Sequence, residues 1–268
     1  MELRVAGLIV VGVLLQMNLL ERFIYYPEAH LEATPAAFGM RFEDARFTAA
    51  DGIALHGWYV PGRRPETLVW FHGNAGNISH RLDNLRWLHE IVGVNVLIFD
   101  YRGYGQSEGE PSEAGLYADA RAALAYLRGR DNVDEKRIIY FGRSLGSAVA
   151  VDLSVGEPPY GLILETPFTS VRDMSTRLLP GPLSVVVPSM FDNLAKIPSI
   201  RCPKLFIHGD GDDLVPYEQG RRLYDAAEPP KAFFTIRGAG HNDTYVVGGE
   251  RYFRQIEKFI DSLKSAGD

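Results

Sequence analysis

Short apolar runs alternate with helical patterns over most of this chain. Runs of five or six mostly apolar residues predict buried strands at 67–71, 94–99, 137–141, 161–165, 204–208 and 232–236. Apolar residues recur at helical spacing between them, which predicts helices at 79–92, 113–130 and 250–263. Two strand-like stretches, 41–49 and 53–60, flank the turn Asp51-Gly52 and predict a hairpin. Together these elements predict an α/β fold, with a mostly parallel central sheet, helices on both faces and an antiparallel edge.

The first 24 residues differ from the rest, because Val5 to Leu15 is unbroken apolar or glycine. This stretch with its neighbours is close to the shortest length that spans a bilayer. Bulky residues, Phe23 to Pro27, follow it in place of a small-residue cleavage site. We therefore expect residues 1–24 to form an uncleaved membrane anchor. A cleaved signal for export, with a periplasmic location in a bacterium, and a helix packed on the domain surface remain alternatives. Residues 25–268 are expected to form one domain.

The composition of the chain argues against several classes of function. The chain has 268 residues, 46% of them hydrophobic, and a net charge of −6 without a basic run, which argues against a nucleic-acid surface. Cys202 is the only cysteine, so no intrachain disulfide exists, and its apolar setting indicates a structural thiol rather than a nucleophile. No Cys/His spacing indicates a metal site, and no cofactor is implied.

The pentapeptide Gly142-Arg143-Ser144-Leu145-Gly146 lies between a predicted strand and a helix-forming segment. A strand that turns sharply into a helix at this point holds Ser144 at the apex, and the glycines leave room for the turn. We predict that Ser144 is a nucleophile. The alternative is a plain strand-to-helix turn that contains a serine.

A serine hydroxyl needs a base and an orienting acid to react at neutral pH. His208 and His241 are the histidines after Ser144, and His208 falls at the end of a predicted strand. His241 lies in a glycine-rich loop after the last strand, where a catalytic base is expected in a parallel sheet, so we predict that it is the base. The residues alone leave the acid open among Asp210, Asp212 and Asp213, with Asp243 and Asp173 as weaker candidates.

The loop after the strand at 67–71 contains His72-Gly73-Asn74-Ala75-Gly76. Its glycines let the backbone approach a ligand closely. We predict that the amides of Asn74 and Leu145 form an oxyanion hole. A phosphate loop is the weaker alternative, because the lysine and hydroxyl residue that end such loops are absent.

These motifs, with Asp100 to Ser107, Val215-Pro216 and Gly240-His241, resemble the α/β-hydrolase superfamily from about residue 25 to the end. The branch that the chain resembles is the small membrane-anchored serine hydrolases, which include depalmitoylating thioesterases. The resemblance implies that Asp212 is the acid, with Asp213 as the fallback, and that 174–203 is a short cap. It also implies a structural role for the loop 100–107.

The predicted activity is hydrolysis of carboxylic esters through an acyl-enzyme, on a small or lipid-like acyl ester, by Ser144, Asp212 and His241. A thioesterase would use the same residues, and a serine peptidase or a non-enzymatic binding module are further alternatives. The depalmitoylating relatives have an N-terminal cysteine cluster that this chain lacks, which argues against transferring protein depalmitoylation to it. Apolar residues of the cap with Phe168 and Phe191 could line an acyl pocket or pack beneath the cap.

Overall fold

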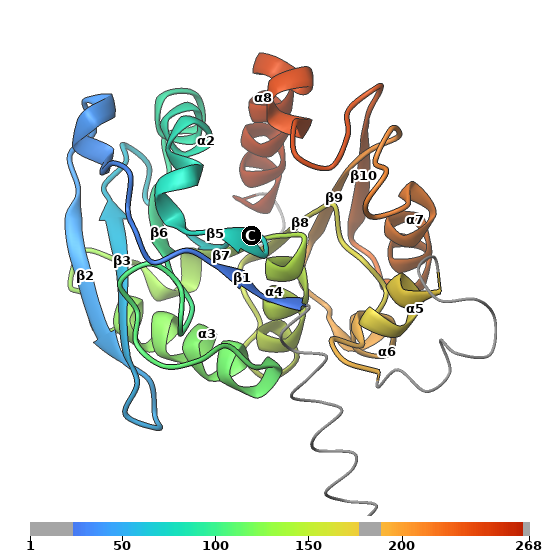
Figure 1. Ribbon diagram of the computed structural model, residues 1–268. Coiled ribbons are helices and arrows are strands. Elements are labelled where there is room, and N and C mark those ends of the chain that lie inside the picture. The colour runs from blue at the N-terminus through green and yellow to red at the C-terminus, as the bar shows by residue number, and fades with distance from the viewer. Residues whose placement is uncertain (1–23, 177–188, 265–268) are drawn as a thin grey trace, which may run out of the picture.

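The computed structural model describes residues 24–176 and 189–264. Within them an eight-stranded sheet has the order β10-β9-β8-β7-β4-β6-β3-β2 (Figure 1). Its strands are β2 (Glu43–Thr48), β3 (Ala54–Val60), β4 (Thr67–Phe71), β6 (Asn95–Phe99), β7 (Ile138–Arg143), β8 (Gly161–Glu165), β9 (Lys204–Gly209) and β10 (Lys231–Ile236). The six strands from β10 to β6 run parallel, whereas β3 is antiparallel to both β6 and β2. The predicted sheet, including its antiparallel edge, is confirmed.

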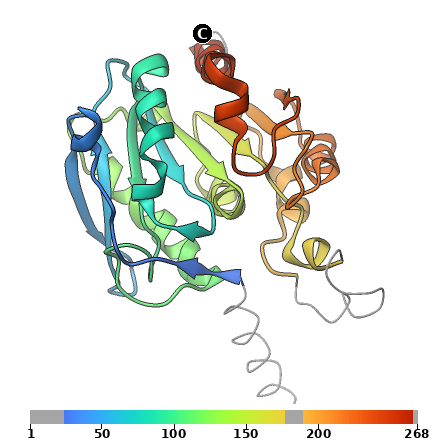
Figure 2. The ribbon, with the colours of Figure 1, turned by 45° about the horizontal axis from the view of Figure 1, so that its top comes forward.

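Helices cover both faces of this sheet (Figures 1 and 2). Helices α3 (Glu113–Arg128), α4 (Leu145–Gly156) and α7 (Tyr217–Ala226) contribute to the apolar core on one face. On the opposite face, α2 (Leu82–Trp87) and α8 (Thr244–Lys264) close a second core. The central strands are buried along their whole length, which explains why they are continuous apolar runs rather than alternating ones.

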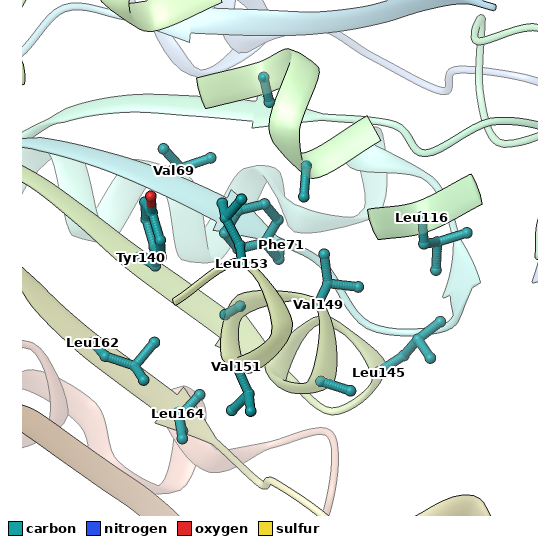
Figure 3. Close-up of a cluster of buried hydrophobic side chains, with 14 of the residues drawn as sticks. Val69, Phe71, Leu116, Tyr140, Leu145, Val149, Val151, Leu153, Leu162 and Leu164 are labelled. Atoms are coloured by element: carbon teal, nitrogen blue, oxygen red, sulfur yellow. The ribbon is translucent and has the colours of Figure 1, made fainter. Parts of the chain in front are cut away.

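Helix α4 is held against the centre of the sheet by small and branched side chains. Figure 3 shows Val149 and Leu153 of α4 near Phe71 of β4, with Leu116 of α3 beyond them. Burial of each such large apolar side chain is worth about 1.5–3 kcal/mol. This packing fixes the N-terminus of α4, and therefore the turn at Ser144, against the carboxyl ends of β4 and β7.

Two predicted helices differ from the expected ones. The segment expected as one helix at 79–92 consists of a 3₁₀ turn, η2 (Ile78–Arg81), then α2, then a π turn, η3 (Leu88–Val92), which ends at Gly93 with φ 78°. The last helix begins at Thr244, earlier than expected, and has a kink at Gly249, where φ is 52°. The glycine pair at 248–249 interrupts the helical pattern, so the sequence indicates only the part after the kink.

Several short elements were not predicted. They are β1 (Tyr26–Pro27), β5 (Ala75–Gly76), the 3₁₀ turns η1 (Pro35–Phe38), η4 (Glu135–Arg137) and η6 (Ile197–Ser199), and the helices α5 (Val171–Ser175) and α6 (Asn193–Lys196). Strands β1 and β5 pair in parallel outside the main sheet. Elements this short carry no periodic pattern, so contacts with the rest of the fold determine them.

Parts of two predicted segments fall outside the described residues. The expected anchor at 1–24 is described only at its last residue, and the expected cap at 174–203 is described at 174–176 and 189–203. Within the described ranges, no helix combines the length and the apolar character needed to cross a bilayer. In the described part of the cap, Phe191 and Ile197 are fully buried in the core that also contains α4.

Candidate active site

Ser144 occupies a strained turn between β7 and α4. Its φ is 51° and its ψ is −117°, a conformation that costs a non-glycine residue energy and persists only where its surroundings enforce it. A side chain at Gly146 would collide with the carbonyl of Phe71, and one at Gly142 would collide with the backbone of Gly146. The Ser144 amide donates to the Glu165 carbonyl at 2.9 Å, which ties the turn to β8. The sharp strand-to-helix turn predicted at Ser144 is therefore present.

His241 brings its ring to Ser144 from the loop between β10 and α8. Its Nε2 lies 2.9 Å from Ser144 Oγ and its Nδ1 lies 2.8 Å from Asp212 Oδ2. A proton on Nδ1 can be donated to the carboxylate, which leaves Nε2 free to accept from the serine hydroxyl. The structure thus brings together the three predicted side chains, Ser144, His241 and Asp212, in one chain of hydrogen bonds.

The surroundings of Asp212 stabilise its ionised form. Its side chain is fully buried, and its Oδ1 accepts hydrogen bonds from the amides of Leu214 at 3.0 Å and Val215 at 2.7 Å. Burial raises the pKa of this carboxyl, but hydrogen bonds from His208 and His241 outweigh it, so the pKa lies well below its usual range. A permanently ionised carboxylate is what a histidine needs to hold one tautomer and to stabilise its charged form.

The structure gives the other candidate residues different neighbours. Asp210 accepts from the Gly238 amide at 2.6 Å, and Asp243 accepts from the Gly240 amide at 2.7 Å, so both shape the loop that carries His241. Asp213 is exposed, and Asp173 contacts Thr169 and Arg222. Geometry therefore favours Asp212, in agreement with the implication of the resemblance.

His208 lies near the end of β9, as predicted, but the sequence did not indicate its contact with Asp212. Its fully buried ring places Nε2 3.0 Å from the Val215 carbonyl and 3.4 Å from Asp212 Oδ2. A carbonyl accepts only from a protonated nitrogen, so Nε2 carries the proton and also faces the carboxylate. Gly220 of α7 leaves room for this ring, since a side chain there would collide with His208 Nδ1. His208 is thus a second histidine beside Asp212 Oδ2, the oxygen that also contacts His241.

The predicted oxyanion amides lie on either side of Ser144. Leu145 is the first residue of α4, and the first amides of a helix have no acceptor within the helix. On the other side, a Cβ built on Gly73 would lie 3.6 Å from Ser144 Cβ, so the loop 72–76 passes directly over the serine. Leu145 is therefore bonded to Ser144 along the chain, and Gly73, the residue before Asn74, lies against Ser144 in the fold.

The buried His72 orients this loop. Its Nδ1 donates to the Gly73 carbonyl at 2.7 Å. The Gly73 carbonyl and the Asn74 N–H belong to one trans peptide plane and point in opposite directions. Holding the carbonyl toward His72 therefore turns the Asn74 N–H away from it. The hydrogen bond fixes the direction of the amide that is predicted to bind the oxyanion.

The Asn74 side chain is held as well. Its Oδ1 accepts from the Tyr104 hydroxyl at 3.0 Å and from the Tyr26 amide at 3.3 Å. Tyr104 belongs to the loop 100–107, in which Arg102 is buried and bound to Asp119. This agrees with the structural role that the resemblance implies for the loop. Tyr104 itself was missed, because nothing in the sequence shows that its hydroxyl reaches Asn74.

Other predicted features bear on the pocket. Phe168 and Phe191 are buried, with ring centroids 6.4 Å apart, which favours the packing interpretation for both. Burial raises the pKa of Cys202 to about 11, which makes it a poor nucleophile, as expected. Within residues 24–176 and 189–264, no cluster of three or more His, Cys, Asp or Glu side chains has the arrangement of a metal site.

Known proteins are similar to this chain over most of its length. A family model described as "Serine aminopeptidase, S33" matches residues 63–195. An uncharacterised protein of Mycobacterium tuberculosis is 40% identical over 251 residues, covering 92% of this chain and 89% of that protein. The α/β-hydrolase domain-containing protein WAV2 of Arabidopsis thaliana is 37% identical, covering 95% of this chain and 92% of its own length. The chain belongs to the α/β-hydrolase superfamily.

Further relatives agree with this membership. The protein bem46 of Schizosaccharomyces pombe is 34% identical to this α/β-hydrolase, covering 90% of the chain and 85% of bem46. An esterase of Pyrococcus furiosus has a similar structure, with a TM-score of 0.74 at 24% identity, covering 88% of this chain and 98% of that one. An acetyl xylan esterase of Paenibacillus has a TM-score of 0.66 at 20% identity, covering 89% and 97%. At these identities the two structures establish the fold.

Proposed function

We propose that this α/β-hydrolase is a serine hydrolase that cleaves carboxylic esters through an acyl-enzyme. The observation that carries the proposal is the continuous chain of hydrogen bonds from Ser144 Oγ through His241 to Asp212, at 2.9 and 2.8 Å. A serine on a strained turn, a histidine with its second nitrogen on an ionised carboxylate, and two nearby amides form the set that acyl transfer requires.

The reaction would proceed in two halves. As Ser144 Oγ bonds to the ester carbonyl carbon, His241 Nε2 takes the hydroxyl proton, and the amides of Leu145 and Asn74 stabilise the negative oxygen. The tetrahedral intermediate collapses, the alcohol leaves with the proton from His241, and the acyl group stays on Ser144. A water molecule then gives its proton to His241 and attacks the acyl carbon, which releases the acid and restores the serine. Asp212 stabilises the charged histidine in both halves.

The direct test is Ser144→Ala, measured with a p-nitrophenyl ester. We expect a folded protein whose kcat is lower by several orders of magnitude, because the nucleophile is absent. Fluorophosphonate should label the wild-type protein at Ser144 and leave the variant unlabelled. Near-wild-type turnover by Ser144→Ala would refute the mechanism, and wild-type protein that folds but resists labelling would favour a binding module.

Substrate class requires a comparison, since thioesters and amides are attacked by the same groups. The description of the matching family model supports a peptidase as the second candidate. A panel of acyl esters from two to sixteen carbons, acyl thioesters and aminoacyl p-nitroanilides separates the three. We expect kcat/KM to be highest for esters. A higher value for the anilides would assign the peptidase instead.

We further propose that residues 1–24 anchor the protein to a membrane and that the substrate is a lipid-like acyl ester. The apolar stretch Val5 to Leu15 supports the anchor. The Tyr26 amide contacts Asn74 Oδ1, and the six Cα-to-Cα steps from Leu20 to Tyr26 span at most about 20 Å. An inserted segment would therefore keep the site close to the bilayer surface.

Lengthening this connection tests the membrane proposal. A flexible insertion of about 20 residues between Arg22 and Phe23 leaves the contact between Tyr26 and Asn74 in place. We expect slower hydrolysis of an ester embedded in vesicles and unchanged hydrolysis of a short soluble ester. Equal loss on both substrates, or on neither, would contradict the proposal. The mass of the mature protein distinguishes an uncleaved anchor from a cleaved signal, because cleavage removes the N-terminal residues.

A further inference from the structure

Arg143, the residue before the proposed nucleophile, reaches across to the loop of the proposed base. Its Nη2 donates to the backbone carbonyl of His241 at 2.9 Å and to Asn242 Oδ1 at 3.2 Å. The two loops are separated by almost 100 positions in the sequence, yet this one side chain connects them. The contact is to His241 itself, so it acts on the residue whose ring must meet Ser144.

The same arginine faces a buried carboxylate. Its Nε lies 3.7 Å from Glu165 Oε2, and the Glu165 side chain is fully buried. Glu165 also accepts through its main-chain carbonyl from the Ser144 amide, and through Oε1 from the hydroxyl of Thr244, the first residue of α8. Arg143 and Glu165 therefore join the nucleophile turn, the end of β8 and the start of α8 in one network behind the site.

A buried ion pair of this kind is an expensive way to stabilise a fold. Removal of both charges from water costs several kcal/mol per ion, and apolar residues of similar volume often serve stability as well or better. The charges here form no direct hydrogen bond, because the side-chain Nε of Arg143 and Oε2 of Glu165 lack a partner within bonding distance. What the arginine does achieve is a specific direction, because its Nη2 donates to the His241 carbonyl and to the Asn242 side chain together.

We propose that Arg143 is a positioning residue that holds the loop of His241 against the turn of Ser144. Glu165 neutralises the buried guanidinium and keeps it aimed at that loop. The 2.9 Å contact between His241 Nε2 and Ser144 Oγ joins two separate loops. Arg143 fixes the distance between these loops through its hydrogen bond to the His241 carbonyl. This inference rests on the proposed serine-hydrolase function, because it assigns a role relative to that pair.

The test compares Arg143→Met and Arg143→Lys in the full-length protein. Methionine fills similar space without the charge or the hydrogen bonds, and we expect kcat to fall roughly ten- to hundredfold, because a displaced base loses its near-attack geometry. KM should change by less than about twofold, since Arg143 is buried away from the substrate. Lysine keeps the charge but lacks the planar guanidinium that holds Nη2 in position, so the kcat of Arg143→Lys should lie between those of Arg143→Met and the wild type.

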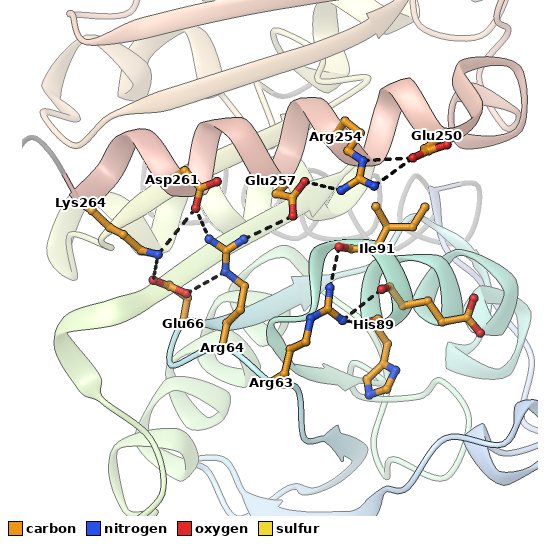
Figure 4. Close-up of polar contacts among 11 residues, drawn as sticks. Arg63, Arg64, Glu66, His89, Ile91, Glu250, Arg254, Glu257, Asp261 and Lys264 are labelled. Atoms are coloured by element: carbon orange, nitrogen blue, oxygen red, sulfur yellow. Dashed lines mark hydrogen bonds and ion pairs between the residues drawn. The ribbon is translucent and has the colours of Figure 1, made fainter.

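Arg64→Met is the matched control. Arg64 also pairs with a fully buried glutamate, Glu66, at 3.3 Å, and contacts Asp261 and Glu257 of α8 (Figure 4). This pair precedes β4, at the end of the strand opposite the site. Its loss should lower the melting temperature and leave kcat within about twofold of the wild type, which separates a positional effect from a general loss of stability.

The result that overturns the proposal is a folded Arg143→Met protein whose kcat stays within threefold of the wild type. If that variant does not fold, Asn242→Ala removes the exposed one of the two acceptors of Arg143 Nη2 and should lower kcat several-fold at unchanged KM. Wild-type kcat in Asn242→Ala would then contradict the proposal. Failure of the proposed function is recognised separately, because Ser144→Ala would keep its activity in that case.

Discussion

Asp212 is the candidate acid that the geometry distinguishes most clearly from the other aspartates nearby. Burial and four donors distinguish it from its neighbours, whereas Asp213 is exposed and Asp210 binds a loop amide. Asp212→Asn should lower kcat by about three to four orders of magnitude, because His241 loses its anionic partner and its preferred tautomer. The same substitution at Asp213 should change kcat by less than about threefold. Steady-state turnover of a p-nitrophenyl ester measures kcat in both variants. A larger loss of kcat in Asp213→Asn than in Asp212→Asn would assign the acid to Asp213.

For single residues, the sequence predicted the candidate reactive side chains but not the contacts that position them. Ser144 and His241 were predicted because their neighbours, the flanking glycines and the ends of strands, are local features. The three aspartates within four positions could not be separated from the residues alone, because burial is a property of the folded chain. The resemblance chose Asp212, and the geometry gives the physical reason. His208 and Arg143 were missed in their positioning roles, since their partners lie in other loops.

Among the elements, the loop after β4 depends most on distant partners. Tyr104→Phe removes one of the hydrogen bonds to Asn74 Oδ1 and leaves the ring in place. A hydrogen bond of this kind is worth about 1 kcal/mol, so kcat should fall about fivefold if the bond holds the Asn74 amide in place for the proposed oxyanion hole. Tyr140→Phe is the control, because its hydroxyl binds the Glu157 carbonyl at the far end of α4. Equal kcat in the two variants would show that the Asn74 side chain does not need this anchor.

Strand prediction succeeded where an apolar run extended over five or more residues. The predicted strands at 67–71 and 161–165 have the observed bounds. It failed for β1 and β5, which have two residues each and exist because the chain at Tyr26 lies along the loop at Ala75. That pairing connects the segment after the apolar N-terminus directly to the loop over Ser144. A local pattern cannot reveal such a contact, because both partners look like ordinary loop residues.

On the scale of the whole molecule, the parallel sheet could be predicted and the order of its strands could not. Buried apolar runs separated by helices indicate parallel pairing, but β4 lies between β6 and β7, and only the folded chain shows this. The order matters for function, because it places the carboxyl ends of β4 and β7 side by side. The loop of Asn74 and the turn of Ser144 follow those two ends, so strand order brings together the residues of the proposed oxyanion hole and the proposed nucleophile.

A buried pair beneath that loop should control how global stability varies with pH. Burial raises the pKa of Asp100 to about 8 and lowers the pKa of His72 to about 3. His72 Nδ1 donates to Gly73, so its unprotonated Nε2 faces Asp100 Oδ1 at 3.6 Å, which suits a protonated carboxyl. Near neutral pH, both groups are therefore uncharged in the folded protein.

The two groups have opposite effects on the free energy of unfolding. Between pH about 4 and 8, folded Asp100 keeps a proton that the unfolded chain has released, so stability falls as pH rises. Between pH about 3 and 6.5, the unfolded chain holds a proton on His72 that the folded protein lacks, so stability rises with pH. These slopes largely cancel below pH 6.5, and above it the decline caused by Asp100 remains.

Asp100→Asn should remove that decline, because asparagine can accept the same hydrogen bond from the Ile78 amide without titrating. Denaturant unfolding of the wild type should show a loss of order 1 kcal/mol between pH 6.5 and 8 that is absent in the variant. Below pH 6.5 the variant should instead gain stability as pH rises, since the slope from His72 is no longer cancelled. Asp131→Asn, at an exposed position, serves as the control and should follow the wild type throughout. Parallel curves for Asp100→Asn and the wild type would mean that Asp100 is already ionised in the folded protein, and that a charged carboxylate lies beside His72 at the start of the loop of Asn74.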